Sequence, residues 1–400
     1  MMRGGEKLRV GILNPASAVG HGGYMQYLQA LTEGLSHHDD LEVLVFFEDP
    51  RSIPDRSLAT GVSWHALPEN EGRLAKVLRA GATILNVPTN SVGRFRALEG
   101  HGLDCLVSCA SPVGFHLGIS FVGIVFDFIY RYFPDLADFP LRERLARDLT
   151  NSRLVKHAAL TVTDSDAGKR DLVRFFGADP ERTRPIPLSP SPHTYAHRAL
   201  PDSTLREVAS RYELPERFVF YPAQLWEHKN HRRLFEALVH LREQHGVVVP
   251  CVLAGSGGAY ADRVLDGIAE LGLEKQVLHV GYVSDEDLCA LYALATALVY
   301  ASFAEYTNMP VLEAMVLETP VVCSNAFAMP EQIGDAGLMF DPFDVEDMAC
   351  QIHQVWTDKP LRERLVRLGA ERAENLSLDK FGKRWRDVII EAAGARADGC

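Results

Sequence analysis

Short apolar runs alternate with longer segments of helical periodicity along most of the 400-residue chain. In the first half, runs of strand length lie at 8–13, 41–47, 104–109, 121–127 and 159–164. Amphipathic helical patterns follow the first and the last of them, at 24–35 and through Arg174. Because parallel strands need a crossover between them, this alternation predicts a parallel sheet covered by helices.

The same alternation begins again after residues 185–202, a segment rich in Pro and His that is typical of a linker. Predicted strands lie at 217–223, 247–255, 276–281, 297–302 and 320–324, with helices between them at 231–246, 259–271, 285–295 and 310–317. This order is that of a doubly wound half. Two such halves predict an α/β protein with two Rossmann-like domains and a ligand at the carboxyl ends of the strands.

We therefore expect an N-terminal Rossmann-like domain over 1–195 and a C-terminal one over 196–378. The tail, 379–400, contains the end of an amphipathic helix predicted at 378–394, which could cross back to the N-terminal domain.

Composition narrows the class of protein. The chain has 41 basic and 53 acidic residues and a net charge of −12, whereas nucleic-acid-binding proteins are normally basic. The seven cysteines are odd in number and contain no C-x-x-C pair, which fits a reducing cytoplasm. The longest apolar stretch, 117–126, is shorter than the roughly 20 residues that span a bilayer. We expect a cytoplasmic protein that binds no nucleic acid, with peripheral contact at the inner face of the membrane left open.

Three loops at predicted strand ends carry candidate chemistry. Gly22 and Gly23 precede the first helix, where glycines admit a phosphate or simply a tight turn. His228 and Lys229 lie between a strand and a helix, where a cation can meet a diphosphate or remain a solvated charge. Gly255 begins a Gly-Ser-Gly-Gly loop that could admit a nucleotide or be an ordinary turn. Each reading stays open on spacing alone.

The stretch Glu305-Tyr-Thr-Asn-Met-Pro-Val-Leu-Glu313 places two carboxylates around a predicted helix start. Pro310 suits the first helical turn, with Asn308 or Met309 at the cap. Glu313 is predicted in the first turn, where the helix dipole favours an acid. Local structure does not explain Glu305.

Other acidic motifs predict helix starts rather than metal sites. Ser284 and Asp287 form a capping box, and Asn230 can cap the helix that follows it. The D-x-D segment 164–166 could hold a divalent ion with a diphosphate, but it precedes a helix, so capping is favoured. The fifteen histidines show no metal-ligand spacing, and we predict neither a metal nor a cofactor.

Taken together, these motifs resemble the retaining glycosyltransferases of family four, which have the two-domain GT-B fold. The resemblance covers most of the chain and is strongest from Phe218 to Asp347. Residues 305–313 look like the E-x7-E signature of that family, and 324–344 resemble the segment that follows it. Residues 221–231, YPAQLWEHKNH, are similar to a subgroup with Y-P-A-Q and H-K-N-H. Residues 163–177 match a helix start near the end of the N-terminal domain.

The resemblance implies a nucleoside-diphosphate-sugar donor, linked to GDP, UDP or dTDP, in the C-terminal domain and an acceptor in the N-terminal domain. Lys229 would neutralise the pyrophosphate, Glu305 would hold the hydroxyls of the sugar, and Glu313 would bind the ribose diol. The further implied donor contacts are Gly22, Gly23, Gln224, His228, Gly255, Tyr282, Val283 and the backbone N–H groups of Thr307, Asn308 and Met309.

Three positions depart from the pattern of that family. Gln224 stands where many members have an arginine, and Phe126 replaces the histidine of a His-Asp pair, which leaves Asp127 and Arg131 as candidates there. Glu318 occupies a position where glycine is common.

The resulting expectation is a metal-independent, retaining hexosyltransferase that acts on a glycan or glycolipid in bacterial surface polysaccharide synthesis. Three alternatives stay open: transfer to a small secondary metabolite, a non-hydrolysing nucleotide-sugar epimerase, and a non-catalytic nucleotide-sugar-binding protein. Donor base and sugar, acceptor and oligomeric state are not predicted.

Overall fold

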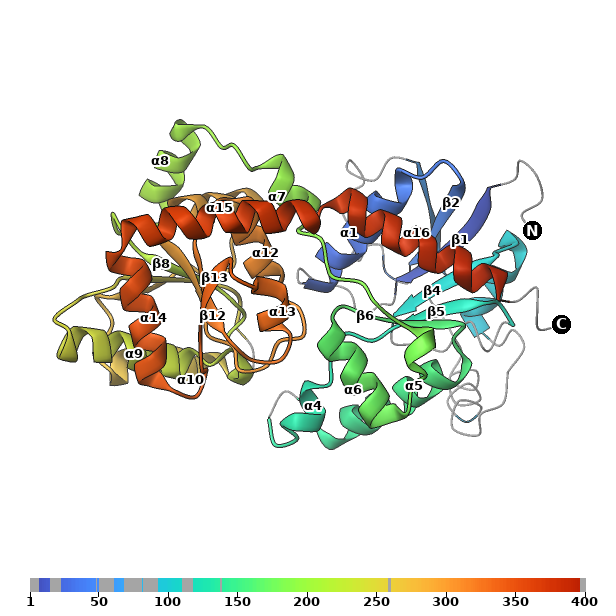
Figure 1. Cartoon of the computed structure of the whole chain (residues 1–400), viewed down its shortest axis with the longest axis horizontal. Coiled ribbons are helices and arrows are strands. Elements are labelled where there is room, and N and C mark those ends of the chain that lie inside the picture. The colour runs from blue at the N-terminus through green and yellow to red at the C-terminus, as the bar shows by residue number, and fades with distance from the viewer. Residues whose placement is uncertain are drawn as a thin grey trace. The chain divides into compact units, whose positions relative to one another are not determined.

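The computed structural model forms two compact units, each described here by itself (Figure 1). Unit 1 comprises Met1–Phe128, Leu141–Pro192 and Ser377–Cys400, and unit 2 comprises Ile129–Pro140 and His193–Leu376. The residues that the structure describes are 7–14, 23–47, 49, 61–67, 81, 93–109, 118–136, 139–257 and 260–395. Ile129–Pro140 belong to unit 2, although the residues on both sides of them in the chain belong to unit 1. The predicted ranges 1–195 and 196–378 contain no such exchange.

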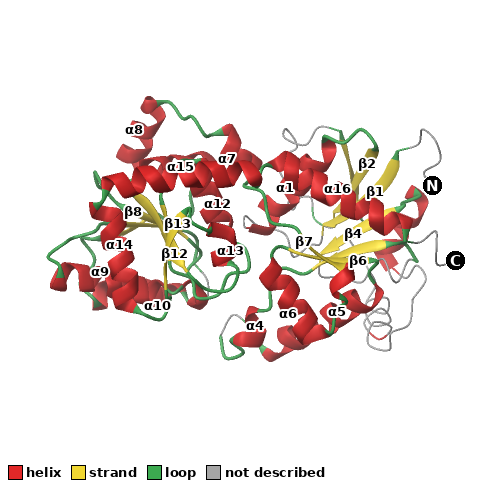
Figure 2. Cartoon of the chain, viewed as in Figure 1, coloured by secondary structure: helices red, strands yellow, loops and turns green. Residues whose placement is uncertain are grey.

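Unit 1 contains a parallel sheet in the order β3-β2-β1-β4-β5-β6-β7 among the described residues (Figure 2). Its strands are β1 (Leu8–Asn14), β2 (Leu41–Phe47), β3 (Val62–Ala66), β4 (Cys105–Cys109), β5 (Phe121–Ile124), β6 (Leu160–Thr163) and β7 (Thr183–Pro185). Its helices are α1 (Gly23–Ser36), η3 (Gly93–His101), α5 (Leu141–His157), α6 (Asp166–Phe176), η4 (Pro180–Arg182) and α16 (Leu378–Gly394). Helices α1 and α16 cover one face of the sheet, and α5 and α6 cover the other (Figure 1).

Unit 2 contains a second parallel sheet in the order β10-β9-β8-β11-β12-β13. Its strands are β8 (Val219–Pro222), β9 (Cys251–Ala254), β10 (Val277–His279), β11 (Ala297–Tyr300), β12 (Val321–Ser324) and β13 (Gly337–Phe340). Its helices are α4 (Ile129–Tyr132), α7 (Pro192–Ala196), α8 (Asp202–Arg211), η5 (Glu227–Lys229), α9 (His231–Gln244), α10 (Ala261–Glu270), α11 (Asp285–Leu294), α12 (Met309–Val316), α13 (Met329–Ile333), α14 (Val345–Thr357) and α15 (Lys359–Asn375). Two doubly wound sheets confirm the predicted Rossmann-like fold class.

The predicted strands all exist, but several are shorter than predicted. The run at 121–127 is a strand only over β5, and the run at 247–255 only over β9. Strands β3, β7 and β13 were not predicted. Strands β3 and β7 are the outer strands of their sheet, and none of the three is fully buried, so none forms a long continuous apolar run. The linker segment 185–202 is partly helical at α7.

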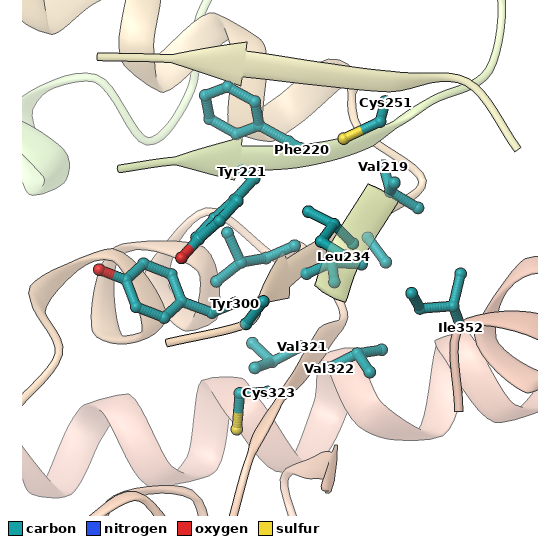
Figure 3. Packing of buried hydrophobic residues seen from close by; sticks show 14 of the residues in the cluster. Val219, Phe220, Tyr221, Leu234, Cys251, Tyr300, Val321, Val322, Cys323 and Ile352 are labelled. Atoms are coloured by element: carbon teal, nitrogen blue, oxygen red, sulfur yellow. The ribbon is translucent and has the colours of Figure 1, made fainter. Parts of the chain in front are cut away.

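The core of unit 2 is built on the central strands of its sheet. All four residues of β8, β9, β11 and β12 are buried, as expected for parallel strands covered on both faces. Figure 3 shows Val219, Phe220 and Tyr221 of β8 with Val321, Val322 and Cys323 of β12 in this core. Each of these buried strands ends where the sequence becomes polar, and the loops that carry the candidate site residues begin there.

Helix α16 packs against α1 within unit 1, over the residues predicted as helix 378–394. The two backbones approach closely at a pair of glycines, since a Cβ on Gly382 would lie 2.3 Å from the carbonyl oxygen of Gly34. Trp385 is fully buried, and Arg386 Nε donates to Asp40 Oδ2 at 2.9 Å. Among the described residues, none of the helices combines the length and the apolar character needed to cross a membrane.

Replacing Gly382 by alanine should destabilise unit 1 by about 1–3 kcal/mol, because the new methyl group meets backbone that cannot move aside cheaply. Urea unfolding of the whole chain measures the change. Gly394→Ala is the matched control: it ends the same helix and its Cβ would have no neighbour within 4 Å. Equal stability of the two variants would contradict the close helix contact.

Candidate functional site

The topological switch point of the second sheet lies between β8 and β11. These strands are neighbours, yet β9 and β10 lie between them in the chain, so the loops that follow β8 and β11 leave in opposite directions. Lys229 lies in the loop after β8, and Glu305 lies in the loop after β11. The switch point of unit 2 therefore brings together the two residues that the sequence singled out.

Lys229 and Glu305 form a buried ion pair. Lys229 Nζ donates to Glu305 Oε1, and the two side chains are 13% and 10% exposed. Lys229 Nζ also donates to the hydroxyl oxygen of Tyr300, 3.1 Å away. Removing two charges from water is costly unless each satisfies the other, so this pair holds both side chains in place.

Two titratable side chains beside the ion pair are uncharged at neutral pH. Burial, and after it the charge of Lys229, lowers the pKa of His231 to about 3, so its ring is neutral at neutral pH. Burial, and after it the charge of Glu305, raises the pKa of Tyr300 well above its ordinary value. Tyr300 therefore remains a protonated hydroxyl, and the pair is surrounded by neutral side chains on these two sides.

Asn230 holds the loop that carries Lys229. It occupies the N-cap position of α9, as predicted, but its backbone is left-handed, with φ of 60°, and its side chain makes no cap bond. The amide Nδ2 instead donates to the carbonyls of Ala301 and Pro342, at 3.0 and 2.8 Å. Tyr221 donates its hydroxyl hydrogen to the carbonyl of Lys229. Figure 3 shows Tyr221 and Tyr300 with their hydroxyl oxygens on the same side of the sheet.

The loops after β8 and β11 are also joined through the backbone of His228. Its carbonyl accepts from Ser302 Oγ at 2.9 Å and from the N–H of Phe303 at 3.0 Å. His228 is 3% exposed. The carbonyl of Gln224, in the same loop, accepts from the N–H of Trp226 at 2.8 Å. The spacing between Lys229 and Glu305 is therefore fixed by two loops bonded to each other.

Glu313 has a different environment from Glu305. Asn308 is the N-cap of α12, with Oδ1 accepting from Val311 N–H at 3.2 Å, as predicted for Asn308 or Met309. Glu313 is not in the first turn, so the dipole explanation is wrong for it. It is 3% exposed, and its Oε2 accepts from the hydroxyl of Tyr292 at 3.0 Å. The two carboxylates thus have separate partners, and neither is a surface charge.

One of the three backbone N–H groups expected to meet a donor is already bonded. The N–H of Asn308 donates to Gln332 Oε1 at 3.0 Å, and Gln332 Nε2 donates to the carbonyl of Asn308 at 2.7 Å. A donor would therefore have to share the N–H of Asn308 with Gln332 or displace Gln332 from it. The expected donor contacts of Thr307, Asn308 and Met309 stay predictions.

Gly255 allows two other loops at the same edge of the sheet to meet. Its φ is +151°, and a Cβ there would lie 2.2 Å from the carbonyl oxygen of Ala223. Its N–H donates to the carbonyl of Gly281 at 2.8 Å, which ties in the loop after β10. Of the residues after Gly281, Tyr282 is 54% exposed and Val283 is buried. The glycine is thus required by backbone packing, whether or not it contacts a nucleotide.

Three of the predicted site residues, Gly22, Gly23 and Asp127, belong to unit 1 and not to unit 2. Gly23 is the first residue of α1, and Gly22 lies outside the described residues. Arg147 Nη1 donates to both carboxylate oxygens of Asp127, at 3.2 and 3.1 Å. Burial opposes the charge of Arg147, but Asp127 and Glu143 raise its pKa. Asp127 is therefore half of an ion pair, a constraint that the sequence did not indicate.

Phe126 packs against two tyrosine rings where the family pattern has an imidazole. Its ring meets that of Tyr27 edge-on at 5.0 Å and that of Tyr24 at 6.0 Å. Arg131, the other residue considered there, lies in α4 and belongs to unit 2. The substitution of Phe126 thus replaces a polar contact by aromatic packing.

An aromatic cluster beside Glu305 was missed by the sequence analysis. Phe327 meets the ring of Tyr132 at 5.0 Å and that of Tyr306 at 5.2 Å. Phe133 meets the ring of Phe303 at 4.9 Å. Tyr132 and Phe133 come from the segment that joins unit 2 out of chain order, so no local pattern could have placed them here.

Two left-handed residues flank the ion pair. Among the described residues, the non-glycine positions with positive φ are Glu213, Asn230, Glu318 and Phe327. Asn230 follows Lys229, and Phe327 precedes Ala328, whose N–H donates to the carbonyl of Glu305 at 3.2 Å. A left-handed aromatic residue costs roughly 1–2 kcal/mol and persists where the surroundings impose it. Glu318, the third departure from the family pattern, occupies a turn with φ of 58°.

The other acidic motifs start helices as predicted. In segment 164–166, Ser165 is the N-cap of α6, and Ser284 is the N-cap of α11. Ser284 Oγ accepts from the N–H of Asp287 at 3.1 Å. The carboxylate of Asp287 does not complete the capping box, because both of its oxygens accept from Arg211.

A family comparison matches the segment that carries this site. Residues 206–372 match the family described as Glycosyl transferases group 1. The chain is 36% identical over 222 residues to "O-antigen chain mannosyltransferase B" of Escherichia coli, covering 55% of this chain and 57% of that protein. It is 26% identical over 268 residues to "D-inositol 3-phosphate glycosyltransferase" of Streptomyces bingchenggensis, covering 64% and 58%. The matches thus span little more than half the length of these curated relatives.

Solved structures confirm the GT-B fold. Sucrose-phosphate synthase from Thermosynechococcus elongatus superposes with a TM-score of 0.76 at 19% identity, covering 97% of this chain and all of that chain. The Anabaena protein HepE, solved with UDP and glucose, has a TM-score of 0.73 at 17% identity, covering 96% and 99%. At these identities the likeness concerns the fold alone.

The strain at Phe327 can be measured with two substitutions. Phe327→Ala and Phe327→Gly both remove the ring, so both should be less stable than the natural chain. Because glycine accepts the left-handed backbone without a Cβ penalty, the glycine variant should be more stable than the alanine variant by about 1 kcal/mol. Urea unfolding of both variants provides the comparison, and a more stable alanine variant would refute the strained conformation.

Proposed function

Because residues 206–372 match the family described as Glycosyl transferases group 1, we propose that the chain is a retaining hexosyltransferase that uses a nucleoside-diphosphate sugar. The observation that carries the proposal is the buried pair of Lys229 and Glu305 at the switch point of unit 2. A cation at the carboxyl ends of parallel strands is suited to a diphosphate, and a fixed carboxylate is suited to sugar hydroxyls.

The pair divides the work of the reaction. Lys229 stabilises the negative charge that grows on the diphosphate as the bond between the sugar carbon and the phosphate oxygen breaks. Glu305, held by its loop, accepts hydrogen bonds from hydroxyls of the donor sugar and so fixes the reacting carbon. Tyr300, which stays protonated, keeps the ammonium of Lys229 in position by accepting from it.

Retention needs no strong protein base. The acceptor oxygen attacks the sugar carbon on the face that the phosphate leaves, and its proton passes to the departing phosphate oxygen. The new carbon–oxygen bond thus replaces the old one with the same anomeric configuration. We propose this mechanism, together with independence from a metal, from the family resemblance and from the cation that Lys229 already supplies.

Mannose is the sugar that the comparisons favour. The E. coli relative at 36% identity is a mannosyltransferase of an O-antigen chain, and "Serotype-specific mannosyltransferase WbdA" of the same organism is 31% identical over 163 residues. We therefore propose GDP-linked mannose as the first donor to test and a polysaccharide or glycolipid as the acceptor. With such an acceptor we propose a location in the cytoplasm, at the inner face of the membrane.

Release of GDP from GDP-mannose by the purified chain tests this function, with UDP- and dTDP-sugars in parallel. Lys229→Ala and Glu305→Ala should each lower the rate about 100- to 1,000-fold, because each removes a preorganised charge from the transition state. Lys275→Ala and Glu274→Ala are matched controls, since both are exposed residues of unit 2, and they should retain the full rate. Excess EDTA should leave the rate unchanged.

Other outcomes distinguish the alternatives. Binding of a nucleotide sugar without turnover, with or without acceptor glycans, would identify a non-catalytic binding protein. Conversion of the donor to its epimer would identify an epimerase, and turnover only with small aglycones would redirect the search for the acceptor. Failure of every donor to bind or react would overturn the proposal.

A further inference from the structure

The opposite edge of the second sheet carries an open hollow lined by charged and apolar side chains. It lies where the strands begin: Arg217 comes just before β8, Thr296 just before β11 and Pro320 just before β12. The hollow has a volume of about 490 Å³ and opens to solvent. Since Lys229 and Glu305 follow the carboxyl ends of β8 and β11, this hollow is separate from the candidate donor site.

Three cations line the hollow. Lys359 and Arg362 come from the first turn of α15, and Arg217 comes from the chain entering β8. Two acidic residues, Glu216 and Glu363, line it as well, and Glu363 Oε1 lies 3.7 Å from Lys359 Nζ. The apolar wall of the hollow consists of Leu294, Ala295, Pro320 and Val366.

The two arginines point at the same atom. Arg217 Nη2 donates to the carbonyl oxygen of Trp356 at 2.8 Å, and Arg362 Nη1 donates to that oxygen at 3.0 Å. Arg362 Nη1 also donates to the carbonyl of Val355 at 2.7 Å. The guanidinium of Arg217 lies 4.2 Å from the ring of Trp356. Capping the end of α14 therefore uses one nitrogen of each guanidinium.

The remaining N–H donors have no carboxylate partner among the described residues. A guanidinium has five N–H groups, so most donors of Arg217 and Arg362 stay available to a ligand. Other arginines of the described chain, such as Arg147, Arg211 and Arg386, are bonded to acids, and their pKa values are raised.

Arg362 differs from these arginines. Burial, and after it the charge of Arg217, lowers its pKa, although Asp358 and Glu363 act in the opposite direction. Among the described arginines whose pKa shifts, it is the one that shifts downward. The two positive guanidinium groups donate to the same carbonyl oxygen and so repel each other beside the open hollow. An anion bound there would reduce this repulsion.

We propose that this hollow is a binding site for a phosphate monoester. Two forked guanidinium groups and one ammonium match the geometry and the double charge of a phosphate better than those of a single carboxylate. The phosphate would lie between Arg217, Arg362 and Lys359, and the organic part of the ester would lie on the apolar wall. The ligand would be either a soluble sugar or glycerol phosphate, or the headgroup of a phosphatidate lipid.

Trp356 provides a local signal for binding, because Arg217 stacks on its ring. Titration of the whole chain with glycerol 3-phosphate should change the tryptophan fluorescence in a saturable way, and calorimetry should give the same affinity. Trp356→Phe should lose the fluorescence change and keep the heat. Parallel titration with vesicles of phosphatidylcholine, with and without phosphatidic acid, separates the lipid source from the soluble one.

Variants assign the binding to this hollow rather than to the donor site. Arg217→Ala, and Arg217→Ala with Arg362→Ala, should weaken binding by about tenfold or more, because each removes a charged fork. Arg242→Ala is the matched control, since Arg242 also donates to two backbone carbonyls, those of Gly272 and Leu271, outside the hollow. Arg242→Ala and Lys229→Ala should both bind like the natural chain.

Thermal melting of each variant checks that it is folded. If the double variant does not fold, the binding of Arg217→Ala alone tests the site. Saturable binding of either phosphate source that Arg217→Ala weakens would support the site. Absence of binding to both sources, binding that Arg217→Ala leaves unchanged, or binding that Lys229→Ala abolishes would overturn it.

Discussion

The site of unit 2 depends on one buried ion pair. Lys229 and Glu305 come from loops that lie far apart in the chain, and each side chain is almost removed from water. Such a pair is tolerated only when geometry lets each charge satisfy the other, so the loops after β8 and β11 must be held in register. Most of the local structure around them serves that requirement.

Three features meet the requirement in different ways. The sheet order places β8 beside β11, so that their loops start from adjacent points. The carbonyl of His228 accepts from Ser302 Oγ in the loop after β11, and Asn230 Nδ2 donates to Ala301 at the start of that loop. Asn230 and Phe327 then accept left-handed backbone on either side of the pair. Backbone strain persists where the surrounding contacts impose it, and here the strained residues lie next to the two charges that the proposed reaction uses.

The sequence predicted the features that depend on local pattern. Continuous apolar strands gave both sheets, and loops at strand ends gave Lys229, Gly255 and Glu305 as candidates. Strands β3 and β7 escaped because outer strands need little apolar surface. The role of Asn230 was misjudged because a cap residue looks the same in sequence whether its amide binds its own helix or, as here, a distant carbonyl.

Contacts between distant segments were beyond sequence patterns. The aromatic residues of segment 129–140 join unit 2 from another part of the chain, and Phe327 is left-handed at a position that no propensity would assign to phenylalanine. The pairing of Asp127 with Arg147 and the convergence of Arg217 and Arg362 likewise join separate elements. Tertiary packing determines each of these.

The role of the ion pair can be tested most directly by calorimetric binding of GDP, or of the diphosphate whose sugar supports turnover. In our account, Lys229 binds the diphosphate, and Glu305 pairs with the charge of Lys229 when no diphosphate is bound. Glu305→Gln should then bind the diphosphate at least as tightly as the natural chain. Lys229→Met should bind it at least about tenfold more weakly, because the diphosphate then lacks the positive charge that pairs with it. If Glu305→Gln lost as much affinity as Lys229→Met, or if Lys229→Met bound normally, the pair would not be the diphosphate site.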